Sequence, residues 1–375
     1  MLDKIQLSGF KSIKEMELEL HSLNVLIGAN GAGKSNLISF FKMFNYLMSN
    51  NLQQYIATSG FADMMLYYGA KRTPQISATL NFSTHAGKNV YHMRLVNAAQ
   101  DTLIFADEAI SFSRNDVDGY APLISLGAGH RESKLLDNEQ LGTHDQRFNQ
   151  RTANVIKSIM QRWKEYHFHD TSNEAKIKKS AYINDNHYLR DDAGNLPAFL
   201  YQMKQKNETH YKRIVNTIQA VTPFFGDFVL SPSALNPDYI ILNWRDRGAD
   251  PDIVFGPHQL SDGTIRLISL ITLLLQPNLP ELIVIDEPEL GLHPYAISIL
   301  AALLKSVSQK TQIIVSTQSV ALVDQLDPEH LVVVDRNDNQ SIFKRVNKIE
   351  LESWLEEYSL GELWEKNVLG GRPAQ

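Results

Sequence analysis

The segment Val25–Phe41 places the strongest single constraint on what this chain can fold into. It reads VLIGANGAGKSNLISFF: an apolar run typical of a buried strand, a loop with three glycines, and then apolar residues at helical spacing. A glycine-rich loop can curl so that several backbone N–H groups point at one place, and the helix that follows adds the positive end of its dipole. The segment therefore predicts an anion site between a buried strand and a helix.

Residues Gly28–Ser35 fit the phosphate-loop pattern G-x-x-x-x-G-K-[ST]. In such a loop the lysine reaches the β- and γ-phosphates of a nucleotide, and the Ser or Thr hydroxyl binds Mg²⁺. A chance match in a glycine-rich turn is the alternative, and the buried strand before the loop and the apolar helix after it argue against that. The residues expected to hold ATP and Mg²⁺ here are Asn30, Gly31, Gly33, Lys34 and Ser35.

A second segment supplies acidic groups that such a site needs. In LIVIDEPEL, four apolar residues predict a buried strand, and Asp286 and Glu287 follow at its carboxyl end, where open α/β sheets bind ligands. Asp286 can hold Mg²⁺, and Glu287 can accept a proton from an attacking water. An acidic turn after a core strand is the alternative. Lys34, Asp286 and Glu287 together indicate ATP hydrolysis.

A third segment, HQLSDGTIRLISL, places Ser261 at the predicted start of a helix. A serine N-cap beside free helix N–H groups forms another anion site. One chain rarely needs two γ-phosphate sites on separate helices. The economical explanation is that this second site serves the nucleotide of another subunit.

At this point the chain resembles a known group. Leu260–Gly263, LSDG, looks like the signature motif of ABC-type ATPases in the form found in RecF, SMC and OLD-like (AAA_21) proteins. The order along the chain is also similar, with Gly291–Pro294 in the position of the D-loop. SGFKSIKEMELEL near the start and KSN after the phosphate loop resemble RecF and SMC heads. The resemblance covers both ends of the chain and leaves its middle unmatched.

The resemblance implies an ATP-sandwich homodimer, in which each phosphate loop faces the signature motif of a second copy. It implies that Ser261 and Gly263 contact the partner's nucleotide and that Lys11 and Asn36 lie near the chain's own. The switch position, usually His, carries Gln318, which can hydrogen-bond phosphate or water but has no ionisable ring. Slow turnover would follow. The glutamine of the Q-loop stays open among Gln53, Gln54 and Gln75.

The predicted fold class is α/β: an ABC-type P-loop NTPase head with a largely parallel sheet, an antiparallel β subdomain and a helical insertion. Alternating apolar strands and helices at both ends of the chain predict the sheet, and a polar middle with helical periods, such as 153–166 and 198–220, predicts the insertion. We expect an N-terminal lobe over 1–112, the insertion over 113–225, a C-terminal lobe over 226–345 and a helical tail over 346–375.

Composition excludes several classes. The formal net charge is −6, so no global positive field draws the chain onto nucleic acid, and the stretch 131–213 has only 15 basic against 11 acidic residues. The absence of cysteine excludes disulfides and thiolate metal sites. The longest apolar run, Ile265–Leu275, is too short to span a bilayer, and the N-terminus has no secretion signal. We expect a cytoplasmic protein.

Weaker motifs leave alternatives open. In YHFHD, His167, His169 and Asp170 form part of a metal site or part of a solvated polar segment. The tail positions Leu351 and Trp354 belong to an amphipathic helix that docks on the core or binds a partner. Asp335 and Asp338 begin a Toprim-like nuclease or sit on a strand-turn-strand, and the chain is too short for the former.

The leading functional hypothesis is an ATP-hydrolysing head of the RecF/OLD-like type that dimerises on ATP. By resemblance it would act in DNA transactions or antiviral defence and control a separately encoded effector such as a nuclease, with DNA as a further candidate partner. The alternative is a nucleotide-gated scaffold or sensor with little hydrolysis. A transporter ATPase is less favoured, because the signature reads LSDGT and not LSGGQ.

Overall fold

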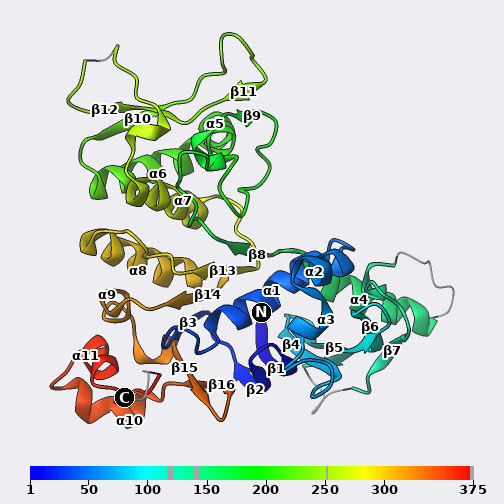
Figure 1. Ribbon diagram of the computed structural model, residues 1–375. Helices are drawn as coiled ribbons and strands as arrows, with labels where there is room; N and C mark the ends of the chain where they lie inside the picture. The colour runs from blue at the N-terminus through cyan, green and yellow to red at the C-terminus, as the bar shows by residue number, and fades with distance from the viewer. Residues whose placement is uncertain (116–120, 138–143, 251, 372–375) are drawn as a thin grey trace.

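The computed structural model describes residues 1–115, 121–137, 144–250 and 252–371. Two six-stranded sheets organise it (Figure 1). No helix within these described ranges is long and apolar enough to cross a membrane. The expected fold class, a mixed α/β head with a largely parallel sheet and an antiparallel subdomain, is confirmed.

The core sheet has the strand order β16-β15-β3-β14-β13-β8. Five of its strands run parallel, and only the edge strand β16 is antiparallel. All five parallel strands therefore end at one edge, where their following loops meet. The strands are β3 (Leu23–Ile27), β8 (Trp163–Tyr166), β13 (Leu282–Asp286), β14 (Gln312–Thr317), β15 (Leu331–Asn337) and β16 (Gln340–Arg345).

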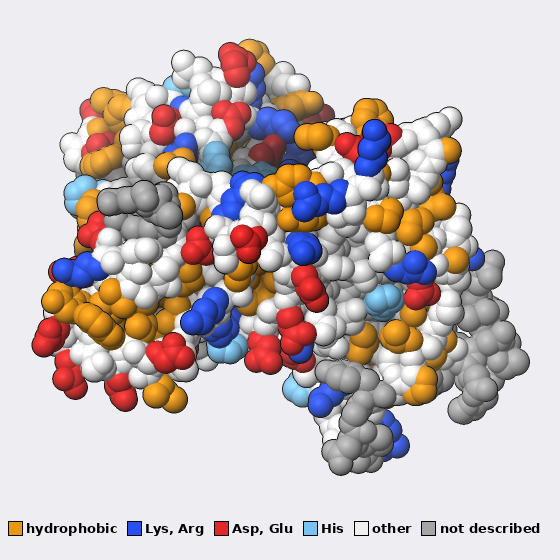
Figure 2. All heavy atoms as spheres, turned by 60° about the horizontal axis from the view of Figure 1, so that its bottom comes forward, with side chains coloured by type: hydrophobic (Ala, Val, Ile, Leu, Met, Phe, Trp, Pro, Cys, Tyr) orange, Lys and Arg blue, Asp and Glu red, His pale blue; other side chains and the backbone are white. Residues whose placement is uncertain are grey.

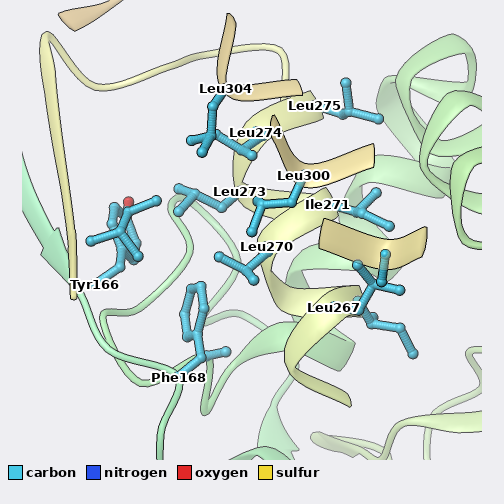
Figure 3. Close-up of a cluster of buried hydrophobic side chains, with 14 of the residues drawn as sticks. Tyr166, Phe168, Leu267, Leu270, Ile271, Leu273, Leu274, Leu275, Leu300 and Leu304 are labelled. Atoms are coloured by element: carbon cyan, nitrogen blue, oxygen red, sulfur yellow. The ribbon is translucent and has the colours of Figure 1, made fainter. Parts of the chain in front are cut away.

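Helices cover both faces of this sheet, as a parallel sheet requires. On one face Leu26, Val284 and Ile314 pack with α1 (Lys34–Leu47). On the other, Val25, Ile285 and Val315 pack with three helices. They are α7 (Asp262–Leu275), α8 (Pro294–Ser308) and α9 (Val320–Val323). Figure 3 shows the leucines of α7 and α8 interdigitating in this second layer.

The antiparallel sheet packs behind α1 and has the order β2-β1-β4-β5-β6-β7. Short helices and α4 lie around it (Figure 1). Its alternating strands have one face in the core, which explains their period-2 pattern. The elements are β1 (Leu2–Phe10), β2 (Ile13–Glu19), β4 (Gln75–Ser83), β5 (Gly87–Ala98), β6 (Thr102–Arg114), β7 (Ile124–Gly127), α2 (Leu52–Thr58), α3 (Phe61–Met65) and α4 (His144–Gln161).

A third layer, at the top of Figure 1, covers α7 from outside. Its α6 packs on α7, and two small antiparallel pairs, β9 with β11 and β10 with β12, complete it. Its elements are α5 (Leu196–Lys206), α6 (Glu208–Val221), β9 (Ala181–Tyr182), β10 (Phe225–Val229), β11 (Tyr239–Ile240) and β12 (Asn243–Asp246).

The expected helical insertion, residues 113–225, contains strands as well as helices, because β7, β8 and β9 all lie within it. We predicted a helix over 153–166, but α4 ends at Gln161 and β8 pairs in parallel with β13 of the core sheet. The Trp163 ring contacts Phe41 and Phe44 of α1, whereas Tyr166 lies in the layer under α7. β8 has only four residues, of which Lys164 is exposed and the other three are buried, so it has no clear alternation to distinguish it from helix. The division into four parts otherwise stays a prediction.

The tail contains two helices, α10 (Lys348–Leu355) and α11 (Leu360–Glu365), where we expected one. α10 ends at Leu355, and Ser359 then begins α11 in a capping box with Glu362. Leu363 and Trp364 are buried and α11 packs on α9, so this part of the tail docks on the core. Trp354 on α10 stays 45% exposed.

Candidate nucleotide site

The phosphate loop connects β3 to α1 at the carboxyl edge of the core sheet. Gly28, Gly31 and Gly33 all have positive φ, at 155°, 78° and 118°. A side chain at Gly28 would overlap the Val334 carbonyl, and one at Gly33 would overlap the Ser341 hydroxyl. Nothing lies within 4 Å of the place where Gly31 would carry one, so the loop is open on that side. No side chain caps α1, which leaves its first N–H groups for an anion.

Lys34 lies folded back along this loop. Its side-chain Nζ donates to the carbonyl oxygens of Gly28, at 2.6 Å, and Ala29, at 3.0 Å. Burial lowers the pKa of the Lys34 ammonium. The carboxylates of Glu287, Asp286 and Glu289 oppose that pKa shift, so the fold brings the predicted lysine and the acidic segment together.

A network of side-chain hydrogen bonds supports the phosphate loop. Asn36 Nδ2 donates to Ser12 Oγ at 2.5 Å, and Ser12 Oγ lies 2.6 Å from Ser341 Oγ. Ser341 Oγ in turn donates to the carbonyl of Ala32 at 2.5 Å. We expected Asn36 to contact the nucleotide. Its amide instead holds the loop from the side of β1 and β16, and a nucleotide contact stays a prediction.

The acidic pair lies at the end of β13. Asp286 is opposite Ser316 of β14 in the ladder, and the Ser316 hydroxyl donates to its carboxylate. The backbone N–H of Glu287 donates to the Ser316 carbonyl at 2.9 Å. Glu287 has φ 41°, in the left-handed region that a residue with a side chain occupies only when its surroundings hold it there.

Gln318 follows β14 and contacts the predicted base directly. Its Nε2 donates to Glu287 Oε1, so the side chain at the switch position lies against the carboxylate. Glu289, 8% exposed, accepts from Thr317 Oγ1 at 2.5 Å and from the Gln318 N–H at 3.4 Å. Burial raises the pKa of the Glu289 carboxyl. Glu289 thus fixes the loop that carries Gln318, a role that the sequence analysis missed.

The loop after β8 brings further polar groups to this edge. His167 Nδ1 lies 3.4 Å from Glu165 Oε1, and Lys42 Nζ lies 3.4 Å from His167 Nε2. Burial raises the pKa of Glu165 to about 7. Burial, and then Lys42, lowers the pKa of Lys11, which places Lys11 in the same group of charges. A location of Lys11 near the nucleotide stays a prediction.

His169 also reaches the edge, and its Nε2 lies 2.9 Å from the carbonyl oxygen of Asp286. YHFHD was the signal that could have located it, had the strand before it been recognised. The parts of the chain that the structure describes contain no group of three or more His, Asp or Glu side chains suited to hold a metal.

The signature segment lies on the opposite face of the core sheet from α1, because α7 packs in the other hydrophobic layer. Ser261 caps α7 by accepting from the Thr264 N–H at 3.1 Å. Gly263 fits directly against the Gly291 carbonyl, with no room for a side chain. A cavity of about 220 Å³ lies at this contact between the two segments, and its lining includes Ser261, Gly263 and His293.

None of the three glutamines considered for the Q-loop reaches the site by its observed contacts. Gln53 Nε2 donates to the carbonyls of Leu103 and Arg131, which ties α2 to the antiparallel sheet. Gln54 is exposed on α2, and Gln75 begins β4. β13 lies between β14 and β8, and in place of a glutamine His169, which follows β8, reaches the Asp286 carbonyl.

Mg²⁺ and ATP fit the residues at this edge. The open loop with an uncapped helix behind it suits a triphosphate. The Ser35 hydroxyl is exposed at the start of α1, and the Asp286 carboxylate ends β13; both are hard oxygen donors of the kind that Mg²⁺ prefers. When bound, the metal would neutralise phosphate charge.

Comparisons with known proteins agree with this geometry. Residues 23–324 match the model of the AAA_21 family, an AAA domain whose description refers to the AbiEii toxin and type IV TA systems. No curated protein matches the chain. Among solved structures, an SMC head bound to the C-winged-helix domain of ScpA has a TM-score of 0.59 and 15% identity, covering 95% of this chain and 99% of that one.

A second similar structure is an Smc head domain with an extended coiled coil, bound to the C-terminal domain of ScpA derived from Pyrococcus furiosus. Its TM-score is 0.51 and its identity 16%, and the match covers 95% of this chain and 98% of that one. At such low identities these likenesses concern the fold.

Proposed function

The chain belongs to this AAA domain family and is an ABC-type ATPase head of the RecF/SMC-like group, and from that premise we propose that it hydrolyses ATP and dimerises on ATP. One observation carries the proposal. The phosphate loop, the acidic pair and Gln318 meet at one edge of the core sheet, with Gln318 Nε2 on Glu287 Oε1.

Each residue then has a role. Asn30, Gly31 and Gly33 present backbone N–H groups to the triphosphate, and Lys34 turns from the loop carbonyls to the β- and γ-phosphates. Ser35 and Asp286 would hold Mg²⁺. Glu287 accepts the proton of the attacking water, and Gln318 orients that water and the γ-phosphate by hydrogen bonds. Lys11 adds positive charge beside the nucleotide.

Dimerisation follows from the two faces of the sheet. Ser261 and Gly263 belong to the layer opposite α1, so a second copy is better placed to close them over the nucleotide. ATP then acts as a switch, because only its γ-phosphate reaches both subunits. Such composite sites generate a symmetric dimer with two equivalent nucleotides.

The test uses a Glu287→Gln variant, which keeps the shape of the site and removes the base. With ATP and Mg²⁺ it should accumulate as a dimer in light scattering after gel filtration, whereas the wild type returns to monomer as ATP is consumed. Lys34→Ala is the matched control and should stay monomeric. Monomers of Glu287→Gln at saturating ATP would refute the composite site.

A second candidate is a nucleotide-gated scaffold with little hydrolysis. Gln318 favours it, because an amide cannot relay a proton as an imidazole can. The two functions differ in steady-state turnover: a wild-type rate equal to that of Lys34→Ala supports the scaffold, and a rate well above it supports the ATPase. A transporter ATPase ranks below both, and co-purification with a membrane subunit would be needed to support it.

The partner belongs to the same proposal. We propose a cytoplasmic role in DNA transactions or antiviral defence, in which the head controls a separately encoded effector such as a nuclease. An SMC head of similar fold is bound to a domain of a second protein, ScpA, which supports a protein partner. Proteins that co-purify only with ATP and Mg²⁺ would identify it. DNA is the other candidate, although Figure 2 shows acidic and basic side chains intermixed on the face drawn there. Retention on DNA that falls with salt would support direct binding.

A further inference from the structure

The peptide that joins Asp286 to Glu287 is held from both sides. On the β14 side, the Glu287 N–H donates to the Ser316 carbonyl at 2.9 Å. On the β8 side, the Asp286 carbonyl accepts from His169 Nε2 at 2.9 Å. A carbonyl can only accept, so this contact also places the ring proton of His169 on Nε2.

The orientation of this peptide affects Glu287, whose own backbone conformation is unfavourable. Glu287 has φ 41°, and the left-handed region is unfavourable for a residue with a Cβ. The two hydrogen bonds fix the plane of the peptide and with it the direction in which the Glu287 side chain leaves the strand. That direction brings its carboxylate to Gln318. Without the bond from His169, only the Ser316 side would hold the plane.

His169 is itself presented from a fixed backbone. Phe168, next to it, is 6% exposed and lies under α7 beside Leu270 (Figure 3). The ring of His169 instead reaches the Asp286 carbonyl at the end of β13. Arg266 of α7 donates to the carbonyls of Phe168, at 3.1 Å, and His169, at 2.7 Å.

We propose that His169 is the positioning residue for Glu287: its Nε2–H orients the 286–287 peptide and so aims the catalytic carboxylate. This inference rests on the proposed function, in which Glu287 activates water. His169 acts through the backbone of its neighbour strand and contacts no reacting atom. It supplies the rigidity that a general base needs to stay within hydrogen-bond reach of its water.

The experiment compares two substitutions in the full chain. Gln at position 169 can place an N–H close to where Nε2 lies, whereas Leu has similar bulk and no donor. His169→Leu should lower kcat about 10- to 100-fold, with KM and nucleotide affinity within about twofold of wild type. His169→Gln should retain most of kcat. His187→Leu, on an exposed loop, is the matched control and should behave as wild type.

A second readout does not depend on turnover. Hydrogen exchange of the Glu287 amide, followed in peptides covering 282–292, should be faster in His169→Leu than in His169→Gln or wild type. If the wild type hydrolyses no ATP, the proposed function fails while this measurement still tests the positioning. Unchanged kcat and unchanged exchange in His169→Leu would overturn the inference. An equal loss of kcat in His169→Leu and His169→Gln would also overturn it, because the amide N–H of glutamine would then fail to replace the Nε2–H donor of His169.

Discussion

At the scale of single residues, the neighbourhood of the site includes a buried carboxyl group, that of Glu165. Glu165 is 7% exposed, and burial is the main reason why its pKa rises to about 7, with Lys42 opposing the rise and Asp191 and Asp286 adding to it. The neutral acid is therefore favoured in the folded chain over a pH range in which the unfolded chain carries the anion. Stability should follow that difference.

Glu165→Gln tests this directly. Between pH 4.5 and about 7 the native state binds a proton at Glu165 that the unfolded state has lost, so wild-type stability falls as pH rises through this window. The variant lacks this dependence. Its free energy of unfolding relative to wild type should therefore increase by about 2 kcal/mol between pH 5.5 and 8 in urea titrations. A difference that stays constant over that range would contradict the assignment.

At the scale of elements, Arg266 joins three segments that meet near the site. From α7 it donates to the carbonyls of Phe168 and His169 after β8, and through Nη1 to Leu290 after β13, at 2.9 Å. Arginine suits this place because its planar fork serves several acceptors at once. Lysine keeps the charge but cannot span the same three carbonyls.

Arg266→Lys should accordingly lower the free energy of unfolding by about 1 to 3 kcal/mol, since two charged hydrogen bonds are lost and carbonyls are left less well satisfied. Thermal and urea denaturation measure the loss. Arg213→Lys, exposed on α6, is the control and should change stability by less than about 0.5 kcal/mol. A loss no larger than that of the control would mean that these bonds carry no net stability.

At the scale of the whole molecule, the phosphate loop and the signature segment lie on opposite faces of the core sheet. The phosphate loop, Asp286 and Glu287 belong to one subunit, and in the proposed dimer Ser261 and Gly263 come from the other. A site assembled from two chains can be complemented by mixing variants, whereas a site within one chain cannot. This difference separates the dimer from a monomeric ATPase.

Lys34→Ala and Ser261→Arg should each be inactive alone. An equal mixture should recover up to about half of wild-type turnover, because only the mixed pair can close on ATP and each mixed dimer holds one intact site. Phosphate release measures the recovery. Lys34→Ala mixed with Glu287→Gln is the control and should recover nothing, since both changes fall on the same half-site. Recovery in the control, or none in the test mixture, would contradict the arrangement.

The sequence alone determined the elements whose signal is local. The phosphate loop needs glycines at fixed positions, Asp286 and Glu287 follow a wholly apolar strand, and Ser261 is a helix cap that its own neighbours define. The turn between β15 and β16 was also predicted, with its polar residues on a hairpin. Such features depend on backbone geometry within a few residues, so the local residue pattern is enough to predict them.

Only the tertiary structure decided which segments meet. β8 has only four residues, so nothing local separates it from the end of α4. In the fold it pairs with β13, and its Trp163 packs against α1. His169 and Glu289 gain their roles from that packing: one through the Asp286 carbonyl, the other through Thr317. Parallel pairing joins residues far apart in the chain, and their complementarity exists only once both strands lie in one sheet.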